Sequence, residues 1–202
     1  AYFEQTFDGE VIKDSFPTNT SDFTTYLNKA VAEQADVIFC PVSIAYSTQI
    51  VKLAADMGLE IPLLGSDTLD SNMVLEAAAG SNVQLYVSTF YQEGGSPEFD
   101  EGIKAWLNED ATAMTNNGGN DTIAAVTAMG YDAYYVALEA LKAAGSIDPA
   151  AVKAALPAVT YTGVSGAIAF DVQGDAIRDT AYIKTADNAN TAWKLEKVQT
   201  AA

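Results

Sequence analysis

Residues 11–91 alternate between short apolar runs and segments with helical periodicity. Strand-like runs occupy 11–16, 36–42, 61–65 and 83–91. Apolar residues recur every three or four positions, as on one face of a helix, at 23–31, 46–57 and 71–80. This alternation, with its short links, predicts an α/β fold in which a parallel sheet is flanked by helices and the connections are right-handed.

After residue 91 the alternation stops. Helical patterns follow at 98–110, 121–144 and 146–156, with a flexible link at 115–120. The tail is β-like, and the NAN at 188–190 predicts a hairpin turn between its last two strands. The three helices have little sheet to pack on, and the opening AYFEQTFDGE reads like the last turns of a helix. We therefore expect the chain to be part of a larger protein.

The charge of the chain excludes several classes of partner. It has 27 acidic residues against 10 basic ones, for a net charge of −17. Nucleic acid and anionic membrane surfaces are not expected partners, because both need a basic surface. No apolar run approaches the roughly 20 residues that span a bilayer. The N-terminal residues also lack the basic head and apolar core of a signal peptide.

Signals for an enzyme are poor. The chain has no histidine, which removes the commonest general base and the commonest metal ligand. It also has no GxSxG motif, no phosphate-binding loop and no metal-ligand cluster. Its single cysteine, Cys40, lies in an apolar run and is interpreted as a buried core residue. The sequence therefore predicts no catalytic residue, no metal site and no cofactor.

Polar and aromatic side chains follow the strand-like runs. In open parallel sheets, ligands bind outside the carboxyl ends of the strands. The residues at these ends are Thr18, Asn19, Thr20 and Ser21, then Ser43 and Tyr46, then Ser66, Asp67, Thr68 and Asp70, and finally Thr89, Phe90 and Tyr91. Their hydroxyls, carboxylates and aromatic rings converge on one edge of the sheet, which suits a small polar molecule with a positive group. Phe90 and Tyr91 have a structural alternative, as core and crossover residues.

Several of the polar residues have a second interpretation as helix caps. Residues 20–22 are suited to cap the helix that follows them, and Asp70 or Ser71 is suited to cap the helix at 71–80. Asp67 lies four residues before Ser71, too early for an ordinary cap, so it either contacts a ligand or stabilises its own turn. A hydrolase that uses Asp67 and Asp70 as an acid pair is a further alternative.

The order of these features resembles the amino-acid class of periplasmic binding proteins, the Leu/Ile/Val-type solute-binding subunits of ABC transporters. The matching segments are SFPTNTSDFTTYLNKAV, ADVIFCPVSIAYSTQIVKLAADMGLEIPLLGSDTLDS, AMGYDAYYVALEAL and YTGVSGAIAFDVQGD. The resemblance implies the type I periplasmic-binding-protein fold, with two lobes that close on a ligand, and a chain that is a C-terminal fragment. Residues 1–91 and 179–202 would form lobe two, and 92–178 the later part of lobe one. A missing N-terminal segment or a second protomer would cover the helices of 92–178.

The resemblance also implies roles for individual residues. Asp67 matches the family's acidic residue that holds the α-ammonium of the ligand. Ser43 falls where many members present an aromatic or small polar contact. This chain has PVS there instead of a Gly-Gly-Tyr type of end, so Tyr46 could substitute. Residues 126–129 match a segment near the mouth of the cleft. The hydroxyls that bind the ligand carboxylate in the family lie in the missing part.

By this resemblance, the chain is expected to belong to a solute-binding subunit that delivers an amino acid to an ABC transporter permease, without being an enzyme. It would work in the periplasm or outside the cell, as a surface lipoprotein in a Gram-positive organism. The expected ligand-binding residues are Ser43, Tyr46, Ser66, Asp67, Thr89 and Tyr91. Alternative ligands are an amide, a urea-like compound, a short peptide or an aromatic acid. A sensor ectodomain with the same fold is a further alternative.

Overall fold

The computed structural model describes residues 2–200 and contains a five-stranded mixed sheet flanked by helices. The strands are β1 (Ile38–Phe39), β2 (Leu63–Gly65), β3 (Leu85–Thr89), β7 (Thr180–Asp187) and β8 (Ala192–Thr200), in that spatial order. The pairs β1–β2 and β2–β3 are parallel, whereas β7 is antiparallel to both β3 and β8. The predicted α/β fold class is therefore confirmed, with an antiparallel hairpin added to the parallel strands.

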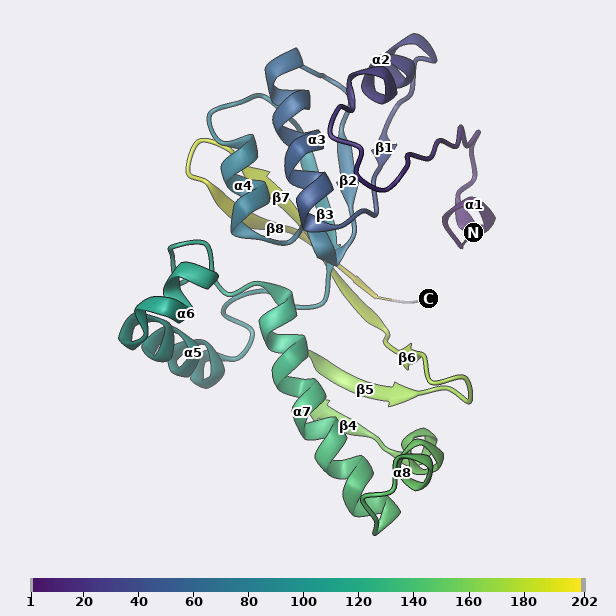
Figure 1. The fold of residues 1–202 in the computed structure, drawn as a ribbon, viewed down its shortest axis with the longest axis vertical. Helices are drawn as coiled ribbons and strands as arrows, with labels where there is room; N and C mark the ends of the chain where they lie inside the picture. The colour runs from purple at the N-terminus through teal and green to yellow at the C-terminus, as the bar shows by residue number, and fades with distance from the viewer. Residues whose placement is uncertain (1, 201–202) are drawn as a thin grey trace.

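The helices of this first region follow the strands in alternation. They are α1 (Tyr2–Thr6), α2 (Thr24–Ala32), α3 (Ile44–Met57) and α4 (Asn72–Ala78), with a 3-10 turn η1 (Asp67–Leu69) before α4. Helices α3 and α4 lie side by side against the sheet (Figure 1). Their apolar faces and the strands form one core, which contains Val51, Leu63 and Leu85 with no exposed surface. Cys40 is buried in this core, as predicted.

The second region lies below the sheet in Figure 1 and is mostly helical. Its helices are α5 (Pro97–Glu109), α6 (Ala111–Asn116), α7 (Ala125–Ala144) and α8 (Pro149–Ala155), followed by a 3-10 turn η2 (Leu156–Ala158). A small antiparallel sheet consists of β4 (Tyr161–Gly163), β5 (Gly166–Phe170) and β6 (Ala176–Ile177). Two small apolar clusters hold this region together, one around Tyr91 and Phe99, the other around Val136 and Ile168.

The predicted strand at 11–16 is wrong, because these residues form no ladder. None of their backbone amides donates to a backbone carbonyl among the described residues. Lys13 and Asp14 instead form ion pairs with Glu4 and Lys29, so the segment is held by side chains at the surface. Residues 12–15 are exposed. A half-polar segment of this kind gains too little free energy from the burial of apolar surface to pair with the edge of β1.

The helix boundaries differ from the predictions where caps decide them. Asp110 accepts hydrogen bonds from the amides of Thr112 and Ala113 and so starts α6, a helix that the sequence pattern did not indicate. The long helix begins at Ala125, four residues later than predicted. Asp148 caps α8 by accepting the amides of Ala150 and Ala151, and the hairpin turn predicted at 188–190 lies between β7 and β8. No described helix is both long and apolar enough to cross a membrane.

Candidate functional site

The segment between β2 and α4 carries the central candidate residues. Gly65 ends β2, and a side chain at this position would overlap the buried Leu69, since a Cβ would lie 2.2 Å from its side chain. The chain therefore turns sharply into η1. Ser66 and Thr68 share a hydrogen bond of 3.0 Å between their hydroxyls. Thr68 also donates to the carbonyl of Val42 at 2.8 Å, which ties the turn to the segment between β1 and α3.

Asp67 occupies the first position of η1 and is half-buried. Its carbonyl accepts the amide of Asp70 at 3.1 Å, but no described residue donates a hydrogen bond to its carboxylate or forms an ion pair with it. The sequence left two roles open for Asp67, contact with a ligand or stabilisation of its own turn. The Ser66 and Thr68 hydroxyls hold the turn instead, and the Asp67 side chain takes no part in these hydrogen bonds.

Asp70 has a different role from the helix cap that the sequence offered as one alternative. Ser71 caps α4 by accepting the amide of Val74 at 3.3 Å, whereas Asp70 is 2% exposed and forms an ion pair with Lys184 at 2.9 Å. The Thr89 hydroxyl donates to the same carboxylate oxygen at 2.9 Å. Because Asp70 is buried and paired, Asp67 and Asp70 do not form an accessible acid pair.

Two expected ligand contacts, Thr89 and Tyr91, point into the protein. Thr89 has no exposed surface, and Tyr91 is 1% exposed. The Tyr91 hydroxyl donates to Asp100 at 2.6 Å and accepts the amide of Ser96 at 3.2 Å. Burial and the neighbouring Asp100 carboxylate raise the pKa of Tyr91 well above its usual range. In this arrangement both hydroxyls serve the fold.

The start of α3 places Ser43 and Tyr46 at the same edge of the sheet. Ser43 is exposed and makes no side-chain cap. Tyr46 packs its ring edge-on against Phe16, with centroids 5.1 Å apart, and its hydroxyl accepts the amide of Asn19 at 3.1 Å. The structure therefore brings Ser43, Ser66 and Asp67 to the carboxyl edge with accessible side chains, while Tyr46 has internal partners.

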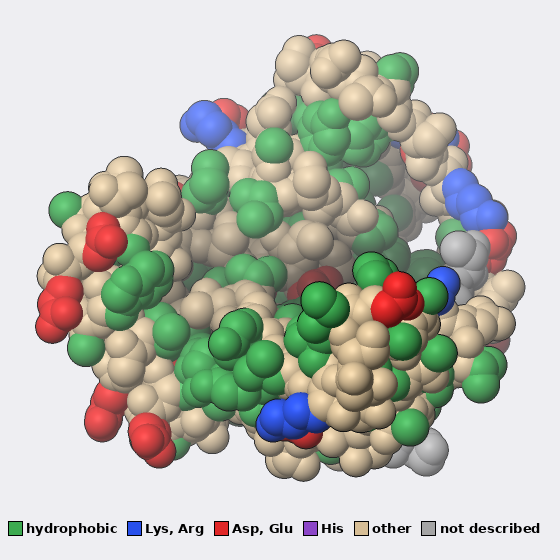
Figure 2. All heavy atoms as spheres, turned by 60° about the horizontal axis from the view of Figure 1, so that its bottom comes forward, with side chains coloured by type: hydrophobic (Ala, Val, Ile, Leu, Met, Phe, Trp, Pro, Cys, Tyr) green, Lys and Arg blue, Asp and Glu red, His purple; other side chains and the backbone are tan. Residues whose placement is uncertain are grey.

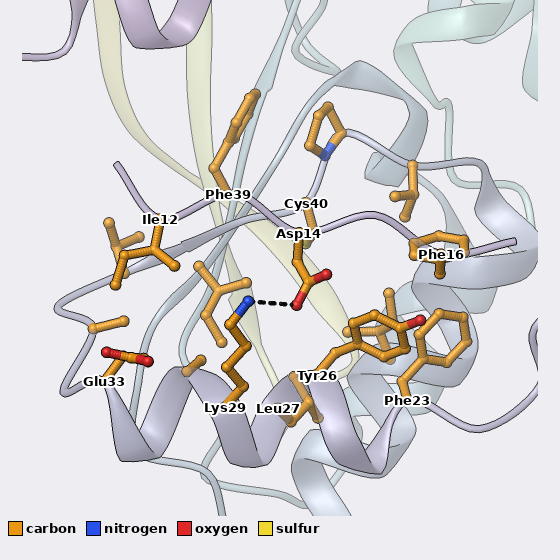
Figure 3. A pocket seen from close by; sticks show the side chains of 17 residues that line it. Ile12, Asp14, Phe16, Phe23, Tyr26, Leu27, Lys29, Glu33, Phe39 and Cys40 are labelled. Atoms are coloured by element: carbon orange, nitrogen blue, oxygen red, sulfur yellow. Dashed lines mark hydrogen bonds and ion pairs between the residues drawn. The ribbon is translucent and has the colours of Figure 1, made fainter. Parts of the chain in front are cut away.

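A cavity lies elsewhere, between residues 12–16, α2 and β1 (Figure 3). It measures about 370 Å³ and its lining is mostly apolar, with the ion pair of Asp14 and Lys29 at 2.9 Å beside it. Burial raises the pKa of the Cys40 thiol in this lining to about 11. None of the expected ligand-binding residues lines this cavity, whereas Ile12, Asp14 and Phe16 from the segment 11–16 do.

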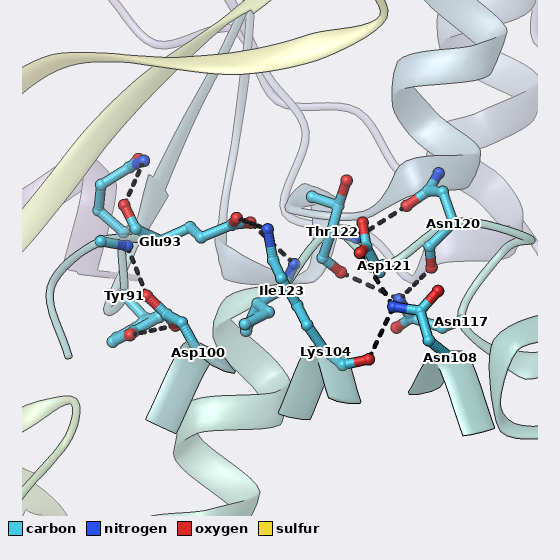
Figure 4. A network of polar contacts seen from close by, with 12 residues as sticks. Tyr91, Glu93, Asp100, Lys104, Asn108, Asn117, Asn120, Asp121, Thr122 and Ile123 are labelled. Atoms are coloured by element: carbon cyan, nitrogen blue, oxygen red, sulfur yellow. Dashed lines mark hydrogen bonds and ion pairs between the residues drawn. The ribbon is translucent and has the colours of Figure 1, made fainter. Parts of the chain in front are cut away.

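A network of polar contacts fixes the segment that leads into α7 (Figure 4). Glu93 accepts the amide of Ile123 at 3.2 Å and forms an ion pair with Lys104, which raises the pKa of Lys104. Asn117 donates to the carbonyls of Asn120 and Thr122 at 2.8 and 3.0 Å. These contacts were not predicted, since the sequence suggested only a flexible link here. Residues 2–200 contain no cluster of three or more carboxylates and thiols that could hold a metal ion.

Comparison with known proteins adds a family to this geometry. The family model described as periplasmic binding protein matches residues 1–190. A comparison with curated protein sequences gave no match. Leucine-binding protein LivK from Thermotoga maritima is similar in structure, with 24% identity and a TM-score of 0.70 over 92% of this chain and 50% of that chain.

Two further solved structures show the same fold with different ligands. LivJ from Streptococcus pneumoniae, solved in complex with isoleucine, has 22% identity and a TM-score of 0.67 over 98% of this chain and 54% of its own. A solute-binding protein from R. palustris, solved with benzoate, has 18% identity and a TM-score of 0.73 over 96% of this chain and 52% of its own. The chain thus spans about half the length of these structures. With a type I periplasmic-binding fold and a family match over residues 1–190, the chain belongs to the periplasmic binding protein family.

Proposed function

We propose that the chain is part of an extracytoplasmic solute-binding subunit of an ABC importer, and that it binds an amino acid or a related amine. The observation that carries the proposal is Asp67, a half-buried carboxylate at the carboxyl end of β2 that has no partner among the described residues. An ammonium that enters a closing cleft loses its water, and an unpaired buried charge costs several kcal/mol. A carboxylate at this position offsets that cost by a charge-assisted hydrogen bond.

Ser43 and Ser66 are the other accessible members of the proposed site. Both lie at the carboxyl edge of the parallel strands, and their hydroxyls can each donate or accept a hydrogen bond. The proposal keeps three further residues near this edge, where they support the site: Tyr46, Thr89 and Tyr91. A ligand that touches this edge and a second lobe favours the closed arrangement by its differential affinity, and no covalent step is involved.

The lobe assignment remains part of the proposal. Residues 1–91 and 179–202 would form lobe two, of which residues 1, 201 and 202 lie outside the described chain, and 92–178 would form part of lobe one. Either a further segment of the protein or a second protomer would cover the exposed faces of α5 and α7. The permease partner and the location outside the cytoplasm follow from the role of a solute-binding subunit.

The Asp67→Asn variant tests the ligand class. Calorimetry with L-leucine and L-isoleucine should show a loss of at least about 2 kcal/mol in binding free energy relative to the unchanged chain, because the ammonium then lacks a counter-charge. Asp36→Asn, at an exposed position before β1, is the matched control and should bind as the unchanged chain does. Undiminished binding in Asp67→Asn would show that the ammonium lies elsewhere.

A solute without a cation is the second candidate, since one structural relative was solved with benzoate. Binding of benzoate, with an affinity that the Asp67→Asn variant leaves unchanged or improves, would favour this candidate. Removing a carboxylate near a carboxylate ligand lowers repulsion, so the substitution weakens the binding of an amine but does not weaken the binding of benzoate.

A further inference from the structure

The carboxylate of Asp70 joins three segments that are distant in the sequence. Its Oδ2 atom accepts hydrogen bonds from the Thr89 hydroxyl at 2.9 Å, from Lys184 Nζ at 2.9 Å and from the amide of Ala125 at 3.3 Å. Thr89 ends β3, Lys184 lies within β7, and Ala125 is the first residue of α7. One buried side chain thus links the five-stranded sheet to the long helix of the second region.

Helix α7 has no cap from its own N-terminal residues. Its N-cap position is Ala124, which offers no side-chain acceptor to the first turn. The first amides of a helix need partners from outside the helix, and a negative charge beside them is favourable. Asp70 supplies both, since its carboxylate accepts the Ala125 amide. The cap of α7 therefore comes from the sheet region, 55 residues away along the chain.

A second contact beside Asp70 supports the same connection. Asn72 is 9% exposed, and its Nδ2 donates to the Asn117 carbonyl and to Asn120 Oδ1, both at 2.8 Å. Gly118 packs so closely on Asn72 that a Cβ there would lie 3.1 Å from the Asn72 side chain. Asp70 and Asn72 thus hold both ends of the segment 117–125 that leads into α7.

The Asp70 cap is incomplete in this arrangement. Oδ1 of Asp70 is buried and receives no hydrogen bond from residues 2–200, while Oδ2 accepts three. A buried acceptor without a hydrogen-bond donor raises the free energy of the folded protein, compared with a position of α7 in which the acceptor receives a hydrogen bond. The strength of the cap therefore depends on where the first turn of α7 lies relative to the sheet.

We propose that Asp70, together with Asn72, is a positioning residue that couples α7 to the ligand-binding carboxylate of Asp67. Asp67 begins the 3-10 turn η1 and Asp70 directly follows its last residue, and the Asp70 amide donates to the Asp67 carbonyl at 3.1 Å. A displacement of α7 relative to the sheet is transmitted through Asp70 to this turn. The inference rests on the proposed function, in which Asp67 holds the solute.

Hydrogen exchange of residues 1–202 without any ligand tests the coupling directly. The variant Asp70→Asn with Lys184→Met removes both buried charges, so that neither is left unpaired. Amides of 121–127 should exchange at least about tenfold faster than in the unchanged chain, while strands β2 and β3 keep their rates. Equal acceleration throughout, or no acceleration at 121–127, would overturn the proposal.

Two further variants separate coupling from local damage. Asn72→Ala removes the contact to 117–120 and leaves Asp67 and Asp70 in place, and it should speed exchange at 117–125 and in the 67–70 turn together. Ser71→Ala removes only the cap of α4 and should speed exchange only in the first turn of that helix. Fast exchange at 117–125 with an unchanged 67–70 turn would show that the segments are not coupled.

Calorimetry with L-leucine then distinguishes this inference from the proposed function. If the unchanged chain binds L-leucine, Asn72→Ala should weaken the affinity about tenfold, and Ser71→Ala should leave it unchanged. An unaltered affinity in Asn72→Ala would overturn the coupling. If the unchanged chain binds no amine, the proposed function fails, and the exchange data alone decide whether Asp70 and Asn72 position the turn.

Discussion

At the scale of single residues, buried carboxylates hold loops in place by accepting hydrogen bonds from their backbone amides. Asp132 in α7 is 1% exposed and accepts the amides of Val164 and Ser165 at 2.9 and 2.8 Å as well as the Ser165 hydroxyl. Arg178, the single arginine of the sequence, donates to the carbonyl of Ser165 at 3.0 Å and lies over the ring of Phe90. One carboxylate therefore fixes the β4–β5 turn and, through it, the start of the crossover into β7.

Gly163 gives a sharp test of this packing. A Cβ at Gly163 would lie 2.1 Å from an oxygen of Asp132, so Gly163→Ala must displace the carboxylate from its amide partners. We expect the free energy of unfolding to fall by about 3 kcal/mol, measured by urea denaturation. Gly102→Ala, in the open interior of α5, is the matched control and should raise stability by about 0.5–1 kcal/mol. A similar response of both variants would contradict this account.

Cys40 should make stability depend on alkaline pH. Its folded pKa of about 11 lies above the value of about 8.5 for a free thiol, so the folded state favours the protonated form. The contribution is fully present below about pH 8.5 and is lost as the pH rises to 11, by about 1.4 kcal/mol per pH unit. Unfolding curves of Cys40→Ala should lack this part of the slope. Equal slopes in both proteins would show that the thiol does not titrate as described.

At the scale of elements, the β7–β8 hairpin is held at its turn by one carboxylate. Asp187 forms an ion pair with Lys194 at 2.6 Å and accepts a hydrogen bond from Asn190 at 2.7 Å. The hydrogen bond from Lys194, followed by that from Asn190, lowers the pKa of Asp187 to about 2. The turn therefore closes through side chains as well as through the strand ladder.

The acid stability of this hairpin follows from that pKa. The Asp187 contribution is present above the unfolded pKa of about 3.9 and is lost as the pH falls through about 2. An NMR titration of the Asp187 carboxyl should show a midpoint near 2, and Lys194→Met should move the midpoint upward. Lys197→Met, farther along β8, should leave it in place. A midpoint that does not change in Lys194→Met would contradict the role of Lys194 in lowering the pKa of Asp187.

Local patterns predicted most elements because those elements depend on local signals. The helical pattern of α7 and the turn at 188–190 are both encoded within a short stretch of the chain. The prediction of a strand at 11–16 was wrong because a strand needs a neighbouring strand to pair with, and the periodicity of a segment does not show whether such a neighbour is present. Helix α6 was missed because its Asp110 cap also ends α5, and a short helix carries little periodicity.

The candidate site could be located from the sequence, but the separate roles of the residues within it could not be predicted. Asp67 was found because strand ends gather at one edge, and its lack of a structural role was inferred from its distance to Ser71. The role of Asp70 depends on Lys184, 114 residues away, and on the Ala125 amide. Thr89 and Tyr91 follow a strand, but whether a side chain faces solvent or core there depends on packing that the pattern does not contain.

At the scale of the whole molecule, burial is uneven. The sheet region has one continuous core, whereas the second region has two small clusters. Large apolar side chains on α5 and α7 remain exposed, including Trp106 at 54%, Val126 at 50% and Tyr134 at 62%. Figure 2 shows hydrophobic side chains gathered on the side of the molecule that lies at the bottom of Figure 1, with few basic residues among them. Contiguous surfaces of this kind mark sites of association.

Residues 1–202 in isolation should therefore self-associate through the α5–α7 face, which carries Trp106, Val126 and Tyr134. Repulsion between copies that each carry a net charge of −17 opposes this association. Because salt screens that repulsion, sedimentation velocity should show more dimer at about 0.5 M NaCl than at low salt. Tyr134→Glu, which places a charge in the centre of the exposed α7 stripe, should shift the equilibrium to monomer at both salt concentrations. Met73→Glu, at a similarly exposed position on α4, should behave as the unchanged chain. A monomer at every salt and protein concentration, indifferent to Tyr134→Glu, would show that this face does not drive association.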